Sequence, residues 1–450
     1  MVGIRTFLSA ALAWGFFAQA SAELRVEGEL RARYESLDGQ FRAGLEGSDQ
    51  ALFTRALFLA EWKTGRWAFG AEMQDSRAFL DDEGTPLSGG FVNASDLLQA
   101  YVSVDGPGLL GVGSDGRTVI GRQTISIGSK RQVERVSYAN VIRSFTGIHH
   151  TSSTERGDHL HLFAAVPVER ATGGREGAAE NRFVADEEQW GRRFVGLHFR
   201  RPDAFPALAP DIMAELFVYG LYEQDTDDLE GPDRRYTWPG FRIWRPKAVG
   251  RWDIDLEPSY RFGKRHASSA PSDTEDLEVE AARVIAILGY TFDATWQPRL
   301  AAEWYYASGD EDPADGSFER YERLFGSRRT DLNNTSLHGP LTYANLNAPG
   351  ARLELKPNAV TDARIAWSAS ALASETDQFQ IARLRDSEGL SGRFMGHAVD
   401  MRARYLPKGQ PLVYEIGGSL FTFGEFTKNA PDAPEGSRTL FGYAQATLSF

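Results

Sequence analysis

A strict alternation of apolar and polar residues, repeated at strand length along most of the chain, limits what this sequence can fold into. From Leu24 to Tyr34 the even positions are apolar or small, whereas every odd position is Arg or Glu. The same period of two recurs at 67–74, 253–262 and 399–405. Successive side chains of a β-strand point to opposite faces, so each segment predicts one apolar and one polar face. Because long helical periodicity is not apparent, the pattern predicts an all-β protein.

The alternation by itself fits both a soluble sandwich and a transmembrane barrel, because either can have one apolar and one polar face. After Glu23 no window approaches the roughly 18 uninterrupted apolar residues of a membrane helix, and the mean hydropathy is -0.37. These values exclude a helical membrane protein. The chain also has no cysteine, so neither a disulfide framework nor a cysteine metal site is available.

The N-terminus has the layout of a cleaved secretory signal. Arg5 precedes an apolar stretch from Phe7 to Ala18, and Ala20, Ser21 and Ala22 form a small-residue cleavage site before Glu23. The apolar stretch is shorter than the roughly 20 residues that a membrane anchor needs. We therefore predict a signal peptide at 1–22 and an exported chain at 23–450.

The charge of the chain argues against a nucleic-acid partner, because 49 Lys and Arg residues stand against 62 Asp and Glu residues. Much of the acid is clustered at 225–233, 273–280 and 309–316, in short runs that are typical of solvated loops, and the first and third of them also hold Gly and Pro. Such clusters can also hold calcium, but none of them has the spacing of an EF-hand. We therefore predict neither a metal site nor a cofactor.

The C-terminus favours the barrel. The last ten residues alternate and end on Phe450, and a terminal strand that ends in Phe resembles the signal by which the assembly machinery recognises bacterial outer-membrane proteins. Aromatic residues near the ends of other segments, such as Trp62, Trp67, Trp304, Tyr305 and Tyr405, fit the belts at the two membrane interfaces. We therefore expect outer-membrane lipid and the assembly machinery, through Phe450, as partners.

The length of the chain sets the size of the barrel. At about 10 residues a strand, with short turns and longer loops, residues 23–450 accommodate roughly 16 to 18 strands. Barrels of that width enclose a lumen. No linker divides the pattern, so we predict a single transmembrane antiparallel β-barrel.

Several short motifs are similar to the alginate export family of bacterial outer-membrane porins. Gly121-Arg122-Gln123 is followed by 128–131 (GSKR), 140–141 (NV), 143–145 (RSF) and Gly147, and later matches lie at 326–329, 353–357 and 396–400. The resemblance implies a barrel in the outer membrane, eighteen-stranded in the best-known member, that passes a polyuronate through an Arg-lined path. It favours 18 strands and an anionic polysaccharide such as alginate as the substrate.

The residues expected to line the pore are cations within or beside the alternating segments: Arg122, Lys130, Arg131, Arg143, Arg25 and Arg33. A guanidinium matches a carboxylate with two parallel hydrogen bonds, and a charge that faced lipid at mid-bilayer would cost about 2–4 kcal/mol. Arg within a strand is therefore expected in the lumen or near a strand end. The alternative is that Arg25, Arg31 and Arg33 pair with Glu27, Glu29 and acids of neighbouring strands and only hold the wall together.

Passive export of an anionic polysaccharide is thus the expected function, with no catalytic step. A general or small-solute porin of the same fold is the first alternative. A barrel hydrolase is the second, because His149, His150, His159 and His161 lie near Ser144, Ser152, Ser153, Glu155 and Asp158. No nucleophile motif surrounds these serines, and nearness in sequence does not make a triad. The cluster is therefore more typical of lumen or surface polar residues.

Overall fold

The chain folds into a closed antiparallel β-barrel of eighteen strands. The computed structural model describes residues 22–226, 230–332 and 334–450. Its helices and strands, in chain order, are β1 (Glu23–Asp38), β2 (Ser48–Thr64), β3 (Trp67–Phe79), β4 (Asn93–Pro107), β5 (Asp115–Gln123), β6 (Phe145–Ser153), β7 (His159–Glu169), α1 (Gly174–Ala179), β8 (Glu187–Glu188), β9 (Arg192–Arg201), β10 (Met213–Glu223), β11 (Arg235–Arg245), β12 (Arg251–His266), β13 (Asp276–Thr291), β14 (Arg299–Ala307), β15 (Ser317–Phe318), β16 (Leu346–Asn358), β17 (Thr361–Ala371), β18 (Phe394–Tyr405), β19 (Leu412–Phe423), α2 (Glu425–Asn429) and β20 (Arg438–Ser449). The two-residue strands β8 and β15 lie in loops, and the other strands form the wall.

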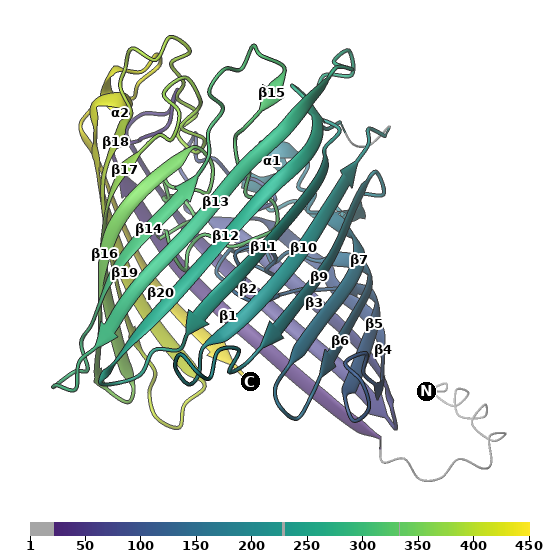
Figure 1. Cartoon of the computed structure of the whole chain (residues 1–450). Coiled ribbons are helices and arrows are strands. Elements are labelled where there is room, and N and C mark those ends of the chain that lie inside the picture. The colour runs from purple at the N-terminus through teal and green to yellow at the C-terminus, as the bar shows by residue number, and fades with distance from the viewer. Residues whose placement is uncertain (1–21, 227–229, 333) are drawn as a thin grey trace, which may run out of the picture.

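Each wall strand pairs with its neighbours along the chain, and β1 also pairs with β20, which closes the sheet (Figure 1). Short turns such as 65–66 and 359–360 connect the strands at the end where both termini of the barrel lie. Long loops, including 124–144 and 308–345, connect them at the other end. Bacterial barrels have their short turns in the periplasm and their long loops outside, which orients this one. The expected count of 18 strands is confirmed.

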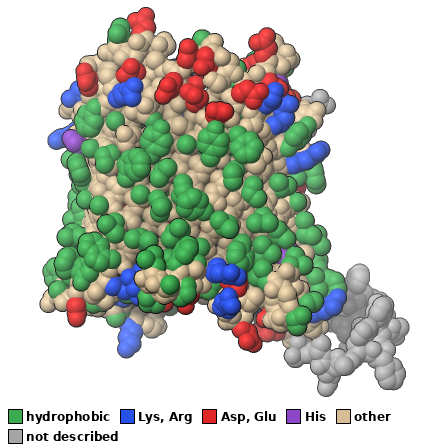
Figure 2. Space-filling view, viewed as in Figure 1, with side chains coloured by type: hydrophobic (Ala, Val, Ile, Leu, Met, Phe, Trp, Pro, Cys, Tyr) green, Lys and Arg blue, Asp and Glu red, His purple; other side chains and the backbone are tan. Residues whose placement is uncertain are grey.

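The sides to which the alternating residues point decide between a sandwich and a membrane barrel. On β1 the apolar Leu24 and Leu30 are 66% and 49% exposed, whereas Arg33 and Glu35 are fully buried. Apolar side chains also form a broad band across the face of the outer wall that Figure 2 shows. A soluble protein would bury the apolar face, so this inverted arrangement is that of a wall that faces lipid and encloses a polar interior.

The aromatic residues near the strand ends divide between the two faces. Trp62, Trp67, Trp304 and Tyr405 are exposed on the outer wall, and the ring of Trp62 stacks on Phe69 at 5.6 Å. Tyr305 is buried in the interior, because it follows the outward Trp304 by one residue on β14. The strand period therefore separates neighbours that a count of aromatic residues groups together.

Acidic side chains gather over the loops at the upper edge of the barrel in Figure 2, which we assign to the outside. Most of the predicted signal peptide at 1–22 lies outside the described residues. Among the described helices, none is long and apolar enough to cross a bilayer.

The end of the chain takes part in closing the barrel. The backbone N–H of Gly28 donates to the carbonyl of Phe450 at 2.7 Å, and the N–H of Phe450 donates to the carbonyl of Gly28 at 3.0 Å. A side chain at position 28 would overlap the ring of Phe450, so the glycine makes room for it. Phe450 therefore extends the pairing of β20 with β1 by one residue.

We expect deletion of Phe450 to lower the amount of folded barrel, because the variant loses two hydrogen bonds at the seam and the terminal aromatic group. The measurement is the fraction of membrane protein that changes gel mobility on boiling. Phe450→Tyr, which keeps the ring and the backbone, is the control and should fold as the parent does. An unchanged folded fraction in the deletion variant would show that the last residue is dispensable for assembly.

Candidate functional site: a plugged lumen with two basic cavities

Two loops fold into the lumen and pair with each other, and together we call them the plug: loop 124–144 and loop 308–345. Val133 and Phe325 form a parallel β-bridge, and the N–H of Glu134 donates to the carbonyl of Phe325 at 3.1 Å. The N–H of Ser327 donates to the carbonyl of Lys130 at 2.9 Å. Two of the motif blocks found in the sequence, 128–131 and 326–329, therefore meet inside the barrel.

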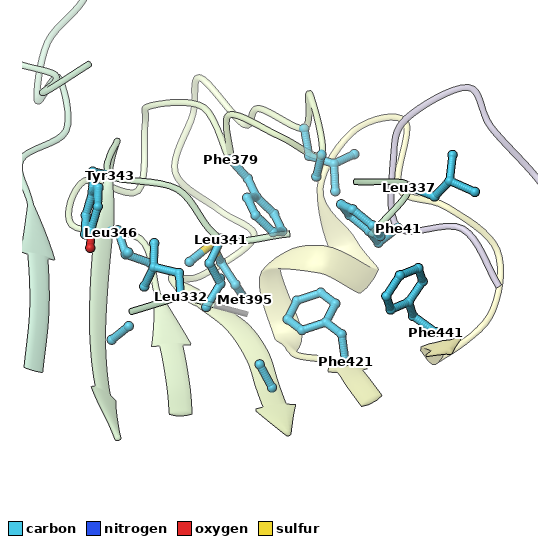
Figure 3. Packing of buried hydrophobic residues seen from close by; sticks show 14 of the residues in the cluster. Phe41, Leu332, Leu337, Leu341, Tyr343, Leu346, Phe379, Met395, Phe421 and Phe441 are labelled. Carbon is cyan, nitrogen blue, oxygen red and sulfur yellow. The ribbon is translucent and has the colours of Figure 1, made fainter. Parts of the chain in front are cut away.

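Apolar residues within these loops fasten the plug to the wall. Ile127 and Val133 of loop 124–144 belong to one buried cluster with Phe194 and Trp238 of the inner wall. On another part of the wall, Leu332, Leu337 and Leu341 of loop 308–345 belong to a second buried cluster, which also holds Phe41, Phe421 and Phe441 (Figure 3). Burial of such side chains contributes about 1.5–3 kcal/mol each. The plug is therefore a packed part of the structure.

Arg131 joins both loops of the plug to the wall. Its guanidinium lies 2.7 Å from Asp331 of loop 308–345, and 2.9 Å and 3.0 Å from Glu257 and Asp255 of β12. Burial alone would lower the pKa of Arg131, but the three carboxylates outweigh it and raise that pKa above the usual value. This residue, predicted to line the pore, is thus fully engaged by acids.

Arg33 lies at the seam of the barrel and contacts four separate segments. Its guanidinium pairs with Glu35 of β1 at 2.6 Å and donates to the carbonyl of Tyr138 at 2.8 Å. It also donates to the hydroxyl of Ser336 at 3.2 Å and to the side chain of Gln445 on β20 at 3.4 Å. Arg33 thereby ties β1 and β20 to both loops of the plug.

The structure places three other predicted pore residues apart from these. Arg25 is half exposed at the periplasmic end of β1 and pairs with Glu27. Arg122 shares a strand face with the exposed Ile120, and Glu188 of loop 170–191 holds it at 2.8 Å. Lys130 is exposed at the tip of loop 124–144 and makes no ion pair with any described residue.

Arg143, the sixth predicted residue, lines a cavity of about 380 Å³ near the outer end of the barrel. We call this space the outer cavity, and Arg143 shares it with Arg170, Arg192, Arg234 and Arg323. Glu169 is the one acidic residue in its described lining. The outer cavity is therefore strongly basic, although the chain as a whole carries a net charge of -13.

A second basic space, the inner cavity, lies at the periplasmic end and has a volume of about 560 Å³. Its described lining contains six cationic residues against two acidic ones, Glu354 and Asp362. The six are Lys247, Arg299, Lys356, Arg364, Arg402 and Arg404. Arg364, Arg402 and Arg404 alternate with the outward Ile365 and Met401 on β17 and β18, so they point into the lumen.

The histidines lie on β6 and β7. His149 and His161 share a hydrogen bond of 3.0 Å between ring nitrogens, and the ring of His159 lies 4.5 Å from that of His161. His150 contacts the hydroxyls of Ser152 at 2.8 Å and Thr118 at 2.9 Å. A catalytic triad needs a carboxylate to orient the base, and in the described structure Thr118 occupies that place beside His150. Nor do the described side chains form a metal-binding group of three or more His, Cys, Asp or Glu residues.

Loop 170–191 docks on the barrel through a carboxylate with a raised pKa. Asp186 accepts a hydrogen bond from the side chain of Asn93 at 2.7 Å, and its backbone N–H donates to Asp96 at 2.6 Å. Burial, together with the nearby charge of Asp96, raises the pKa of Asp186 to about 7. The docked loop therefore favours the protonated form of Asp186.

A group whose pKa rises on docking contributes stability at low pH and loses it as the pH passes the raised value. We therefore expect loop 170–191 to loosen as the pH rises from 4 through 7. Because the chain has no native cysteine, a spin label at Ala185→Cys can report the mobility of the loop. Asp186→Asn in the same background should keep the label immobile at every pH. An equal pH response in both proteins would assign the effect to another group.

These features define the class of protein. A closed barrel with an apolar outer wall, a polar interior and a plugged lumen is a pore of the bacterial outer membrane. The chain belongs to the alginate export family, whose sequence model, described as "Alginate export", matches residues 22–441. The family and the fold are those of transport porins. A comparison with curated proteins finds no match.

Solved structures that share this fold include proteins of pseudomonads, one of which is described as a porin. OccK9 (OpdG) of Pseudomonas aeruginosa is 12% identical, with a TM-score of 0.60 over 95% of this chain and 98% of that one. A BenF-like porin of Pseudomonas fluorescens Pf-5 is 10% identical, with a TM-score of 0.58 over 95% and 98% of the two chains. OpdK of Pseudomonas aeruginosa, in a structure with vanillate, is 10% identical, with a TM-score of 0.55 over 94% and 98%.

Sequence reasoning missed most of the basic residues of the two cavities. Arg170 and Arg323 lie in loops far from Arg143 in the sequence, and no local pattern links the three. Arg402 and Arg404 had a usable signal, because they alternate with Met401, Ala403 and Tyr405 in a segment recognised as a strand. The direction of each face would have placed both arginines in the lumen.

Proposed function

We propose that this pore exports an anionic polysaccharide such as alginate by passive transport through its Arg-lined lumen. The observation that carries the proposal is the inner cavity, where six cationic residues face two acidic ones at the periplasmic end of the barrel. A polymer made in the cell reaches this end first. The basic inner cavity concentrates anions at the periplasmic entrance of the pore, although the chain carries a net charge of -13, because charge in the lumen selects ions by sign.

The guanidiniums of the inner cavity are suited to binding the carboxylates of uronate sugars. Guanidiniums bind carboxylates with a fixed fork of donors, and hydrated lumen contacts are weak enough to exchange from one residue to the next. Arg402 and Arg404 share the single carboxylate of Asp362, at 3.2 Å and 2.8 Å. The described acids therefore neutralise only part of the positive charge. Repeated weak contacts allow a polysaccharide to move along the lumen, whereas a single tight site would trap it.

We expect the double variant Arg402→Glu/Arg404→Glu to reduce the ratio of anion to cation permeability in planar bilayers by roughly tenfold, equivalent to about 1.4 kcal/mol. Oligouronates added to the periplasmic side should block the current of the parent and lose this effect in the variant. Lys408→Glu, which reverses one positive charge at an exposed residue of the adjacent turn, is the control for charge reversal at this end of the barrel. Unchanged selectivity in a folded double variant would contradict the proposal.

A pore for small carboxylates is the second candidate function. It is favoured by the size of the two cavities beside the plug, which is that of small-molecule sites. One structural neighbour was solved with vanillate, which is a small carboxylate. The two candidates differ in the bilayer experiment. Small carboxylates that carry current while oligouronates neither block nor pass would favour the small-solute pore.

A further inference from the structure

Three guanidiniums from three different loops meet in the outer cavity without a carboxylate partner. Arg143 comes from loop 124–144, Arg170 from loop 170–191 and Arg323 from loop 308–345. Among the described residues, none of the three has a carboxylate oxygen within 4 Å, whereas Arg192 and Arg234 in the same lining pair with Glu223 at 2.6 Å and 2.7 Å. The positive charge of the cavity is therefore concentrated on these three side chains.

The three side chains also have few hydrogen bonds. Arg170 donates to the carbonyl of Val141 at 3.4 Å, and Arg323 donates to the carbonyl of Gly326 at 2.6 Å. Arg143 lies over the ring of Phe325, and its Nη1 is buried without a hydrogen-bond partner among the described residues. Buried donors normally have a hydrogen-bond partner, so the free donors of these side chains are available to a ligand that enters the cavity.

The guanidiniums also act on one another. Burial, and then the charges of Arg170 and Arg323, lower the pKa of Arg143 well below its usual value. Burial, and then Arg170, lower the pKa of Arg323 in the same way. Like charges that are held together in a partly enclosed space favour the entry of an anion.

We propose that the outer cavity binds a small oxyanion with two or more negative charges, and that this anion cross-links the three loops and holds the plug closed. The inference goes beyond export, because the bound anion is a regulator and not the cargo. A divalent anion can satisfy donors from three loops at once, whereas a single carboxylate neutralises one guanidinium. At about 380 Å³ the cavity has the size of a small-molecule site.

The anion would hold the plug closed because the three arginines that bind it come from three different loops. Two of the three arginines belong to the two loops of the plug, and the third belongs to loop 170–191, which lies beside them. An anion that needs all three binds only when the loops are together, so it shifts the population toward the closed arrangement. The anion enters from the outside, because the cavity lies at the outer end of the barrel.

The test uses the purified full-length barrel and inorganic phosphate, with chloride at equal ionic strength as the reference. In calorimetric titration we expect saturable binding that weakens roughly a hundredfold in Arg143→Gln/Arg323→Gln, at about tenfold for each lost guanidinium. Arg182→Gln, which removes one positive charge at an exposed residue of loop 170–191, is the control and should bind as the parent does. Gel mobility before and after boiling confirms that each variant is folded.

In planar bilayers, phosphate in the chamber facing the loops should lower the open probability of the parent and leave the double variant unaffected. Absence of phosphate binding to the folded parent would overturn the site. Binding without any change in open probability would overturn the closing role. Either failure leaves the anion selectivity set at Arg402 and Arg404 intact, so it is distinguishable from a failure of the export proposal.

Discussion

Replacing Arg131 by methionine is expected to release the plug and to increase the mean conductance of the pore severalfold. The variant leaves Asp331, Glu257 and Asp255 together in the interior without their shared cation. Removing one partner of a buried ion pair costs about 3–5 kcal/mol. A loss of that size would shift the equilibrium between the closed and the open plug more than a hundredfold toward the open state. Methionine keeps much of the volume of the side chain, so the loss is electrostatic.

The measurement is single-channel conductance in planar bilayers, with gel mobility as the test of folding. Arg242→Met is the matched control, because Arg242 is also held by acids, Asp255 and Glu215, but connects only strands of the wall. We expect this control to keep the conductance of the parent. If a folded Arg131→Met barrel conducts like the parent, the ion pairs of Arg131 do not hold the plug.

Gly326→Ala is expected to separate the two loops of the plug by a different route. A Cβ at this position would overlap the backbone carbonyl of Arg131, and backbone atoms cannot move aside as a flexible side chain does. Overpacking of this kind costs typically about 1–3 kcal/mol. The bridge between Val133 and Phe325 should therefore break, which would increase the noise of the open channel.

Recordings of current fluctuations test this prediction. Gly442→Ala is the control, because no heavy atom lies within 4 Å of its Cβ position. Since Gly326 does not have a positive φ, any effect comes from the overlap and not from backbone strain. Equal noise in the two folded variants would mean that the loops do not need this close approach.

The wall of the barrel could be predicted from the sequence because its rule is local. Each residue of β1 alternates between lipid and lumen, so the pattern from Leu24 to Tyr34 contains the strand, its two faces and their environments. Phe450 was interpretable for the same reason, since it continues the alternation of the last strand. The family resemblance then favoured eighteen strands within the range that length alone allows.

The contents of the lumen follow no such rule. Ile127 and Leu337 are apolar residues within long loops, and their contacts are with strands distant in the chain. Arg131 and Arg143 have the same chemistry and lie twelve positions apart in the sequence, yet one meets three carboxylates and the other meets arginines. Which of the two is neutralised depends on tertiary neighbours that spacing does not contain.

The position of Arg33 links closure of the barrel to the seating of the plug. Its guanidinium contacts β1, Gln445 of β20 and both loops of the plug, so its full set of partners exists only after the first and last strands have met. During biogenesis, a barrel with an open seam therefore lacks part of what seats its plug. Closure of the seam therefore also completes the contacts of Arg33 with the plug, which couples the pairing of the first and last strands to the seating of the plug.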